Sequence, residues 1–211
     1  YDSLKKWNYH FNKDYVSPSV FDVWWYYVQK NIWDDDLKNI KGGFVLPDEA
    51  VTLNFLRDSV RFKYYDDFAT PDTEDRKFVV RKAYQQAIDS LKRFSENMED
   101  WKWMNVKNTT IRHLARQTPF NHTTVPTGGN RGILNACSRY WGPSWRMVVS
   151  LGKEIEAYGI YPGGQSGNPG SPYYDNWVGE WANGNYRKLW FMRSANDSNG
   201  KVVSRETFKK G

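Results

Sequence analysis

The stretch YPGGQSGNPGSPYYDN, residues 161–176, sets polar side chains among four glycines and three prolines. The side chains there that could bind or act on another group are Gln165, Ser166, Asn168 and Asp175. Flexible linkers are rich in glycine and serine, whereas here prolines that fix φ alternate with glycines that permit positive φ. This composition predicts a loop with one hydrogen-bonded shape.

Two roles are open for this loop. Its polar side chains could form hydrogen bonds with backbone N–H and C=O groups that have no other partner near the glycines. Alternatively, Gln165 or Ser166 could contact a substrate directly. We favour the structural role, because side-chain amides among glycines usually bond to the backbone.

Two further polar residues pose the same choice. Arg146 lies within an apolar run, so it needs a carboxylate or several carbonyls nearby. We favour a structural pair for Arg146 over a clamp on a substrate carboxylate. Asn135 is either a turn residue or a hydrogen-bond donor to a site, and the sequence leaves both roles open.

Established catalytic and metal-binding motifs are absent from the sequence. The histidines, His10, His113 and His122, form no ligand spacing with one another or with the single Cys137. There is no G-x-S-x-G elbow, phosphate-binding loop or dinucleotide fingerprint. The acidic run 34–36 is interpreted as a solvated helix end in preference to a cation site. We therefore assign no catalytic residue, no metal ligand and no cofactor to this chain.

Composition narrows the class of partner. The net charge is +6, but basic residues are mixed with acids along the chain, which argues against a nucleic-acid footprint. No apolar run is long enough for a membrane span. Trp, Tyr and Phe make up 17% of the residues although mean hydropathy is −0.80, so many rings must lie at clefts or interfaces. An aromatic-rich binding module is therefore an alternative to an enzyme.

The periodicity predicts helices first and strands later, an α+β class. Helices are expected over 17–32, 46–62 and 72–98, and the last carries an apolar stripe. Strands are expected over 106–117, 138–152 and 186–193, with a short helix within 175–185. We divide the chain into a helical segment, 1–100, and a sheet-forming segment, 101–211, that contains the loop 161–176. The expected stripe residues are Val80, Ala83, Ala87, Leu91, Phe94 and Met98.

Several motifs, read in order, resemble one family. GPSWRMVVSLG (142–152) precedes PGGQSGNPGSPYYDN (162–176), and PTGGNRGILNA (126–136) lies upstream. Together with Trp181, Gly184 and Tyr186, they resemble the end of the large subunit of penicillin acylases, and the resemblance covers nearly the whole chain. Met104 and Lys107 depart from the family pattern, where a glycine and a histidine are expected, while His113 fits the later histidine.

This resemblance implies an N-terminal nucleophile amidohydrolase with a four-layer αββα sandwich, of which both segments would be parts. Such a precursor cuts itself, and the serine exposed at the start of the large subunit attacks an amide, such as a beta-lactam side-chain amide. The nucleophile, the oxyanion groups and any calcium ligands would lie upstream of this chain. The chain begins with Tyr1 and shows no signal peptide, so we expect a piece of a longer polypeptide that is inactive alone.

The resemblance also implies partners and a location. The partners would be the small subunit, the N-terminal part of the large subunit and a small-molecule amide, and the location would be periplasmic or secreted. Because Met104 and Lys107 depart from the pattern, a catalytically inactive homologue is a second alternative.

Overall fold

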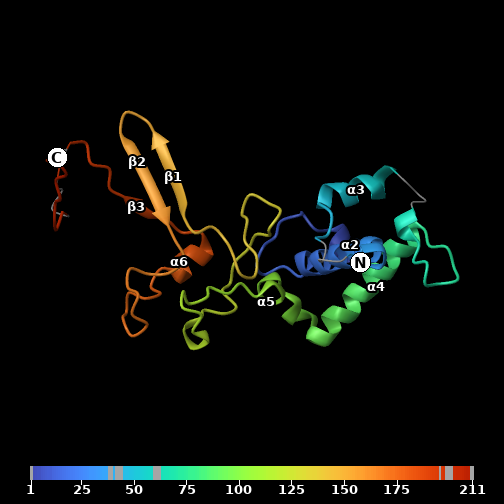
Figure 1. The fold of residues 1–211 in the computed structure, drawn as a ribbon. Helices are drawn as coiled ribbons and strands as arrows, with labels where there is room; N and C mark the ends of the chain where they lie inside the picture. The colour runs from blue at the N-terminus through green and yellow to red at the C-terminus, as the bar shows by residue number, and fades with distance from the viewer. Residues whose placement is uncertain are drawn as a thin grey trace. The chain divides into compact units, whose positions relative to one another are not determined.

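The computed structural model describes residues 2–37, 40, 45–58, 63–194, 196–197 and 202–209. The chain forms two compact units, residues 1–142 and 143–211, and each is described by itself (Figure 1). Helices dominate the first unit, and a small antiparallel sheet lies in the second. This agrees with the predicted α+β class.

The first unit is built around two packed helices, α2 (Ser17–Leu37) and α4 (Arg76–Phe94). Three shorter elements complete its N-terminal part: α1 (Asp2–Lys5), α3 (Glu49–Asp58) and the 3₁₀ turn η1 (Lys63–Tyr65). The predicted helix over 17–32 is confirmed and extends to Leu37, and that over 72–98 is confirmed over the shorter range 76–94. The predicted helix over 46–62 is confirmed for Glu49–Asp58, and its last predicted residues, 59–62, lie outside the described residues.

The core lies between α2 and α4. Apolar side chains from both helices bury one another there. The core also contacts α3, because the indole Nε1 of Trp33 donates to Thr52 Oγ1 at 3.1 Å. Trp24 Nε1 on α2 donates to the carbonyl of Val80 on α4 at 3.0 Å. The central cluster comprises Val28, Ile32, Trp33, Tyr65, Val79 and Ala83.

The apolar stripe of α4 is displaced from the predicted one at both ends. Val79, and not Val80, is buried in line with Ala83, Ala87 and Leu91, because these positions are four residues apart and face α2 together. Asp75 caps the helix by accepting from Phe78 N at 2.8 Å. The predicted stripe residues Phe94 and Met98 are exposed, since the helix ends at Phe94.

The strand expected over 106–117 is not present. Instead α5 (Trp103–Lys107) occupies its start, and Asn108 closes that helix with φ +49° in the left-handed region that asparagine tolerates. Beyond it the chain makes one isolated bridge, between Ile111 and His122. Thr109 Oγ1 bonds to Thr127 Oγ1 at 2.8 Å, so this β-branched residue ties loops together. The 3₁₀ turns η2 (Met98–Trp101) and η3 (Thr118–Phe120) lie before and after this segment.

The second unit contains the antiparallel sheet β1–β2–β3. β1 (Arg146–Leu151) pairs with β2 (Ile155–Ile160), which pairs with β3 (Arg187–Leu189). The register sets Arg146 opposite Ile160 and Ala157 opposite Leu189. β1, β3 and the helix α6 (Val178–Asn183) confirm predicted elements over shorter ranges. We did not predict β2, because its IEAYGI sequence carries Glu, Ala and Gly, which strands disfavour.

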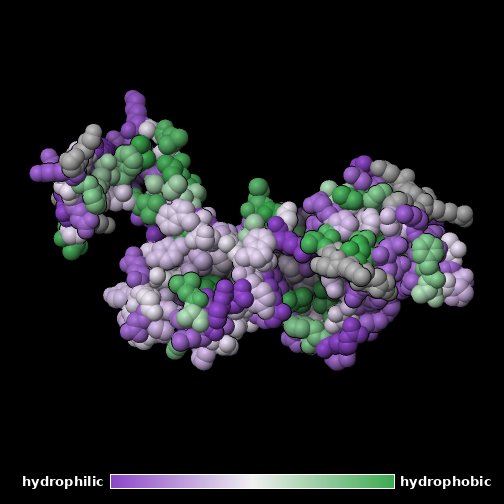
Figure 2. Space-filling model, in the orientation of Figure 1, coloured by the Kyte–Doolittle hydropathy of each residue, from purple (hydrophilic) through white to green (hydrophobic). Residues whose placement is uncertain are grey.

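Strand β1 presents apolar side chains on both sides of the sheet. Met147, Val148 and Leu151 are 57%, 55% and 86% exposed. β1 is also an edge strand, with β2 as its neighbour in the sheet. Figure 2 shows hydrophobic residues over this part of the second unit. In folded proteins, an apolar edge strand of this kind is normally covered by another part of the protein or by a partner.

Candidate functional site

The loop 161–176 has the hydrogen-bonded shape that its composition predicted. Ser166 N donates to the carbonyl of Tyr173 at 3.1 Å, and Trp177 N donates to that of Gly163 at 2.9 Å, so the two ends of the loop lie side by side. Tyr161 OH donates to the carbonyl of Gly164 at 3.2 Å. A Cβ at Gly164 would overlap the carbonyl oxygen of Tyr173, so glycine is required where these two backbones meet.

The polar residues of this loop act mainly on its own backbone. Ser166 Oγ accepts from Asn168 N at 3.1 Å, and Asn168 Oδ1 accepts from Gly170 N at 3.0 Å. These are local turn contacts, in keeping with the structural role that we favoured. Gln165 and Asp175 are both exposed, and the carbonyl of Asp175 accepts from Val178 N at the start of α6.

Arg146 is held by an aromatic residue and a carbonyl. Its Nη1 donates to the carbonyl oxygen of Trp181 at 2.6 Å, and its guanidinium lies 4.9 Å from the centre of the Trp181 ring. Trp181 Nε1 in turn donates to the carbonyl of Pro143 at 2.9 Å. These contacts fix the start of β1 against the end of α6.

Asn135 lies in the first unit, and the other candidates lie in the second. It is exposed and closely approaches Gly129, where φ is +82° and any added Cβ would overlap the Asn135 carbonyl. Among the candidates, the contacts bring Ser166 and Asn168 together in one turn.

A second polar assembly, which we did not predict, surrounds the glycine pair 128–129. Lys107 is only 6% exposed, and its Nζ donates to the carbonyls of Gly128 at 2.6 Å and Gly129 at 3.3 Å. Trp103 Nε1 donates to the same Gly129 carbonyl at 2.7 Å. Gly129 N donates to the carbonyl of Phe11 at 2.8 Å. The departure at Lys107 therefore leaves a donor that organises the glycine pair.

Next to this assembly lies a cavity of about 390 Å³, here called the Asp22 pocket. Asn130 Nδ2 donates to Asp22 Oδ1 at 2.8 Å and so ties the loop after the glycine pair to α2. Burial raises the pKa of Asp22, although the Asn130 hydrogen bond and the charge of Arg131 oppose the change. The pocket is lined by Asp22, Val23, Tyr26, Tyr27, Ser90, Trp103, Val106, Lys107, Asn130, Arg131, Ser138 and Arg139.

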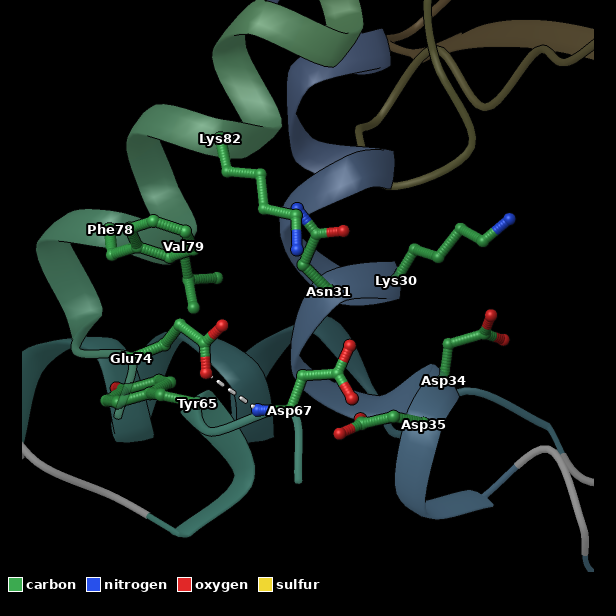
Figure 3. Close-up of a pocket in the computed structure, with 10 residues that line it drawn as sticks. All are labelled: Lys30, Asn31, Asp34, Asp35, Tyr65, Asp67, Glu74, Phe78, Val79 and Lys82. Atoms are coloured by element: carbon green, nitrogen blue, oxygen red, sulfur yellow. Dashed lines mark hydrogen bonds between the residues drawn. The ribbon is translucent and has the colours of Figure 1, made fainter. Parts of the chain in front are cut away.

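A smaller cavity of about 130 Å³ gathers carboxylates near the end of α2 (Figure 3). Asp36 is exposed, as a solvated helix end requires, but Asp34 and Asp35 line this cavity. Burial raises the pKa of Asp35, and the Asp67 carboxylate acts in the same direction. The cavity therefore concentrates negative charge.

Glu74, in the same cavity, is fully partnered. Its carboxylate accepts from Thr70 Oγ1 at 2.8 Å and from Asp67 N at 3.0 Å, the contact drawn in Figure 3. Burial would raise the pKa of Glu74, but these hydrogen bonds to the ionised form outweigh it and lower the pKa. Within the described ranges, no three His, Cys, Asp or Glu side chains are grouped so that they could hold a metal ion.

Weak sequence signals pointed toward the Asp22 pocket. Asp22 is a charged residue within the aromatic-rich helix predicted over 17–32, and Lys107 stands where a histidine was expected. Their proximity could not be predicted, since Asp22 and Asn130 are 108 residues apart. In the part of the chain that the structure describes, no helix is both long and apolar enough to cross a membrane.

Comparison with known proteins places these features in a family. A family model described as penicillin amidase matches residues 1–198. The acyl-homoserine lactone acylase QuiP of Pseudomonas syringae pv. syringae is 32% identical over 143 residues, which cover 60% of this chain and 17% of that protein. The protein of the same name from Pseudomonas aeruginosa is 23% identical over 149 residues, 58% of this chain and 18% of that one.

The chain thus spans only a small part of the length of the curated relatives that it matches. The family model, by contrast, covers nearly all of the residues given. The resemblance seen in the motifs is confirmed, and the chain belongs to the penicillin amidase family.

Proposed function

We propose that residues 1–211 form the C-terminal part of the large subunit of an amidohydrolase that cleaves acyl amides. The observation that carries the proposal is the penicillin amidase match over residues 1–198. The similar proteins are named acylases, which agrees with this reaction class.

The chemistry would be supplied from outside this chain. An N-terminal serine, freed by autoproteolysis, would attack the amide carbonyl with its own α-amino group as the base, and an acyl-enzyme would form. Oxyanion donors would lie with that serine. In this scheme residues 1–211 supply scaffold, and we assign them no catalytic role.

The exposed sheet supports the proposal that other pieces of the same precursor cover this chain. β1 offers an apolar edge and apolar side chains on both sides, led by Met147, Val148 and Leu151 (Figure 2). A strand added beside β1 would satisfy its open backbone groups, and packed layers would bury its side chains. The four-layer αββα sandwich is the arrangement that we propose, with the small subunit and the rest of the large subunit as partners.

For the substrate we propose N-acyl amides, with two classes to be tested. The names of the relatives favour acyl-homoserine lactones. The family description favours beta-lactam side-chain amides such as penicillins. We further propose a periplasmic or secreted location, and that any calcium in the complete enzyme is bound outside this chain.

The test begins with the intact mass of the native polypeptide that contains residues 1–211. The proposal predicts a second chain, and one N-terminus that is serine. The processed protein is then incubated with an acyl-homoserine lactone and with a penicillin, and the released amine is measured. As the control, that serine is replaced by alanine, which should abolish release.

The outcomes separate the proposal from its alternatives. Processing without hydrolysis of any amide would indicate an inactive homologue. An unprocessed, monomeric protein without hydrolysis would favour an aromatic-rich binding module.

A further inference from the structure

The Asp22 pocket is not used by the proposed amide cleavage, whose reacting groups would lie outside this chain. Its volume of about 390 Å³ falls in the range of small-molecule sites, roughly 300–1,000 Å³. All of its lining residues belong to the first unit and to described positions. The cavity is therefore a property of this chain and can be considered by itself.

The charges at the pocket favour an anion. Three cationic side chains, Lys107, Arg131 and Arg139, line it together with one carboxylate, that of Asp22. Lys107 is nine-tenths buried, and its ammonium group is fixed by two carbonyls at the glycine pair. The Asp22 carboxylate is already engaged by Asn130, whose Nδ2 donates to Oδ1 at 2.8 Å.

The two arginines stand at the exposed side of the pocket. Arg131 Nη2 bonds to Glu49 Oε1 at 3.1 Å, which partly neutralises it. Arg139 lies over the ring of Tyr140, with its guanidinium carbon 5.1 Å from the ring centre. A guanidinium carries its N–H donors in one plane, and this geometry can bind the two oxygens of a carboxylate as a pair.

Of the eight remaining lining residues, three are aromatic and two are aliphatic. Tyr26 and Tyr27 of α2 and Trp103 of α5 line the cavity, and Val23 and Val106 add aliphatic surface. Trp103 is buried, with its ring nitrogen already bonded to Gly129, so it offers a fixed apolar surface. Such walls suit the ring or short chain of an organic ligand.

We propose that the Asp22 pocket binds a small organic carboxylate, with its apolar part against Tyr27 and Trp103 and its carboxylate at Arg139. The proposal does not depend on amide cleavage by the complete protein. A carboxylate could also come from an aspartate or glutamate elsewhere in the polypeptide, but the proposal is for a free ligand.

The experiment is calorimetric titration of the native polypeptide that contains residues 1–211. The probe is 3-phenylpropanoate, and 3-phenylpropanamide is the neutral compound of the same shape. We expect the carboxylate to bind at least about tenfold more tightly than the amide, because an arginine fork favours an anion. We expect Arg139→Gln to weaken binding of the carboxylate by a similar factor.

Arg112→Gln is the matched control. Arg112 lies over the same Tyr140 ring, 4.7 Å from its centre, but does not line the pocket. Both variants remove one positive charge and one cation–π contact, so only loss of a pocket residue distinguishes them. Arg131→Gln is a second pocket variant, should Arg139→Gln fail to fold.

Three results would overturn the proposal. Equal effects of Arg139→Gln and Arg112→Gln would show a dependence on net charge alone. Binding that the pocket variants leave unchanged would place the ligand elsewhere, including at a catalytic serine. The third result is that no binding is detected and that the arginine reagent phenylglyoxal fails to modify Arg139 in the ligand-free protein. This result would show that the polypeptide itself fills the pocket. Loss of amide hydrolysis, by contrast, would bear on the proposed function alone.

Discussion

At the scale of single residues, the glycine pair 128–129 depends on buried donors. Lys107 and Trp103 both donate to it from α5, and Asn130 continues the contact to Asp22 on α2. A lysine replaces the histidine that the family pattern led us to expect, but it still supplies N–H donors. The substitution therefore changes the chemistry of this corner without leaving the carbonyls unpaired.

Replacing Lys107 with methionine should destabilise the first unit by about 1–3 kcal/mol, because the partly buried Gly128 carbonyl loses its donor. Lys107→His should lose less, since an imidazole can donate one of the bonds. Urea denaturation followed by far-ultraviolet circular dichroism reports this unit, which holds the long helices. The control is Lys102→Met, at a more exposed lysine that pairs with Glu99, where a change within about 0.5 kcal/mol is expected. Equal losses in the two methionine variants would refute this role for Lys107.

Glu74 gives a prediction for pH. Its pKa lies below the usual 4.5, so the unfolded chain binds more protons in this range. Its contribution to stability is therefore present above pH 4.5 and is lost as the pH falls through the lowered pKa. Glu74→Gln should cost about 1.5 kcal/mol at pH 7, because hydrogen bonds to a charged group are lost, and progressively less toward pH 3.

Urea midpoints at several pH values measure this difference. Asp72→Asn, at an exposed carboxylate close in sequence, is the control and should change little. A gap between Glu74→Gln and the unchanged protein that stays constant from pH 7 to pH 3 would contradict the assignment.

At the scale of elements, the loop 161–176 owes its shape to one close approach of two backbones. Gly164→Ala should open the contact between Gly164 and Tyr173, because the new Cβ has no room beside backbone atoms. Overpacking of this kind costs about 1–3 kcal/mol, so the amides of Ser166 and Trp177 should exchange hydrogen roughly tenfold faster. Gly167→Ala is the control, since nothing lies within 4 Å of its added Cβ. Unchanged exchange in Gly164→Ala would show that the contact does not hold the loop.

Elements whose signals are local were predictable, and others were not. The periodic apolar run within 72–98 predicted α4, although its start after the cap at Asp75 was not predicted and its packing against α2 selected Val79 over Val80. The stretch 106–117 reads as a strand by its Thr and Ile content, but Asn108 ends α5 in a left-handed conformation and the threonines bond to neighbouring loops. Strand β2 has little β propensity and exists because β1 and β3 pair with it.

At the scale of the whole molecule, the described sheet of the second unit has β1 at its edge, with exposed apolar side chains. If the remainder of the precursor covers β1, as we propose, Val148→Glu would bury an unpaired charge and reduce recovery of the assembled protein by about tenfold or more. Co-purification of the separately tagged pieces measures this. Leu114→Glu changes a residue of the first unit that is 96% exposed and should leave assembly unchanged. Assembly that tolerates Val148→Glu would show that β1 is not at the interface.

The sequence by itself determined the family, the placement of helices before the sheet, and the hydrogen-bonded shape of the loop 161–176. Each of these follows from neighbouring residues: ordered motifs, a helical period, or glycines and prolines in one segment. We also favoured structural roles over substrate contact for Arg146, Ser166 and Asn168, and these roles stay predictions. Their observed contacts, to Trp181 and to loop amides, agree with that role.

Only the tertiary structure decided that Asp22, Lys107 and Asn130 meet at one cavity, and that Arg139 stands at its side. These residues come from two helices and two loops. A local sequence pattern does not indicate which side chains from distant parts of the chain will contact one another. The packing of α2 against its neighbours decides which of these side chains meet. Burial of the core side chains fixes the position of each helix, and therefore the position of the polar side chains that the helix carries.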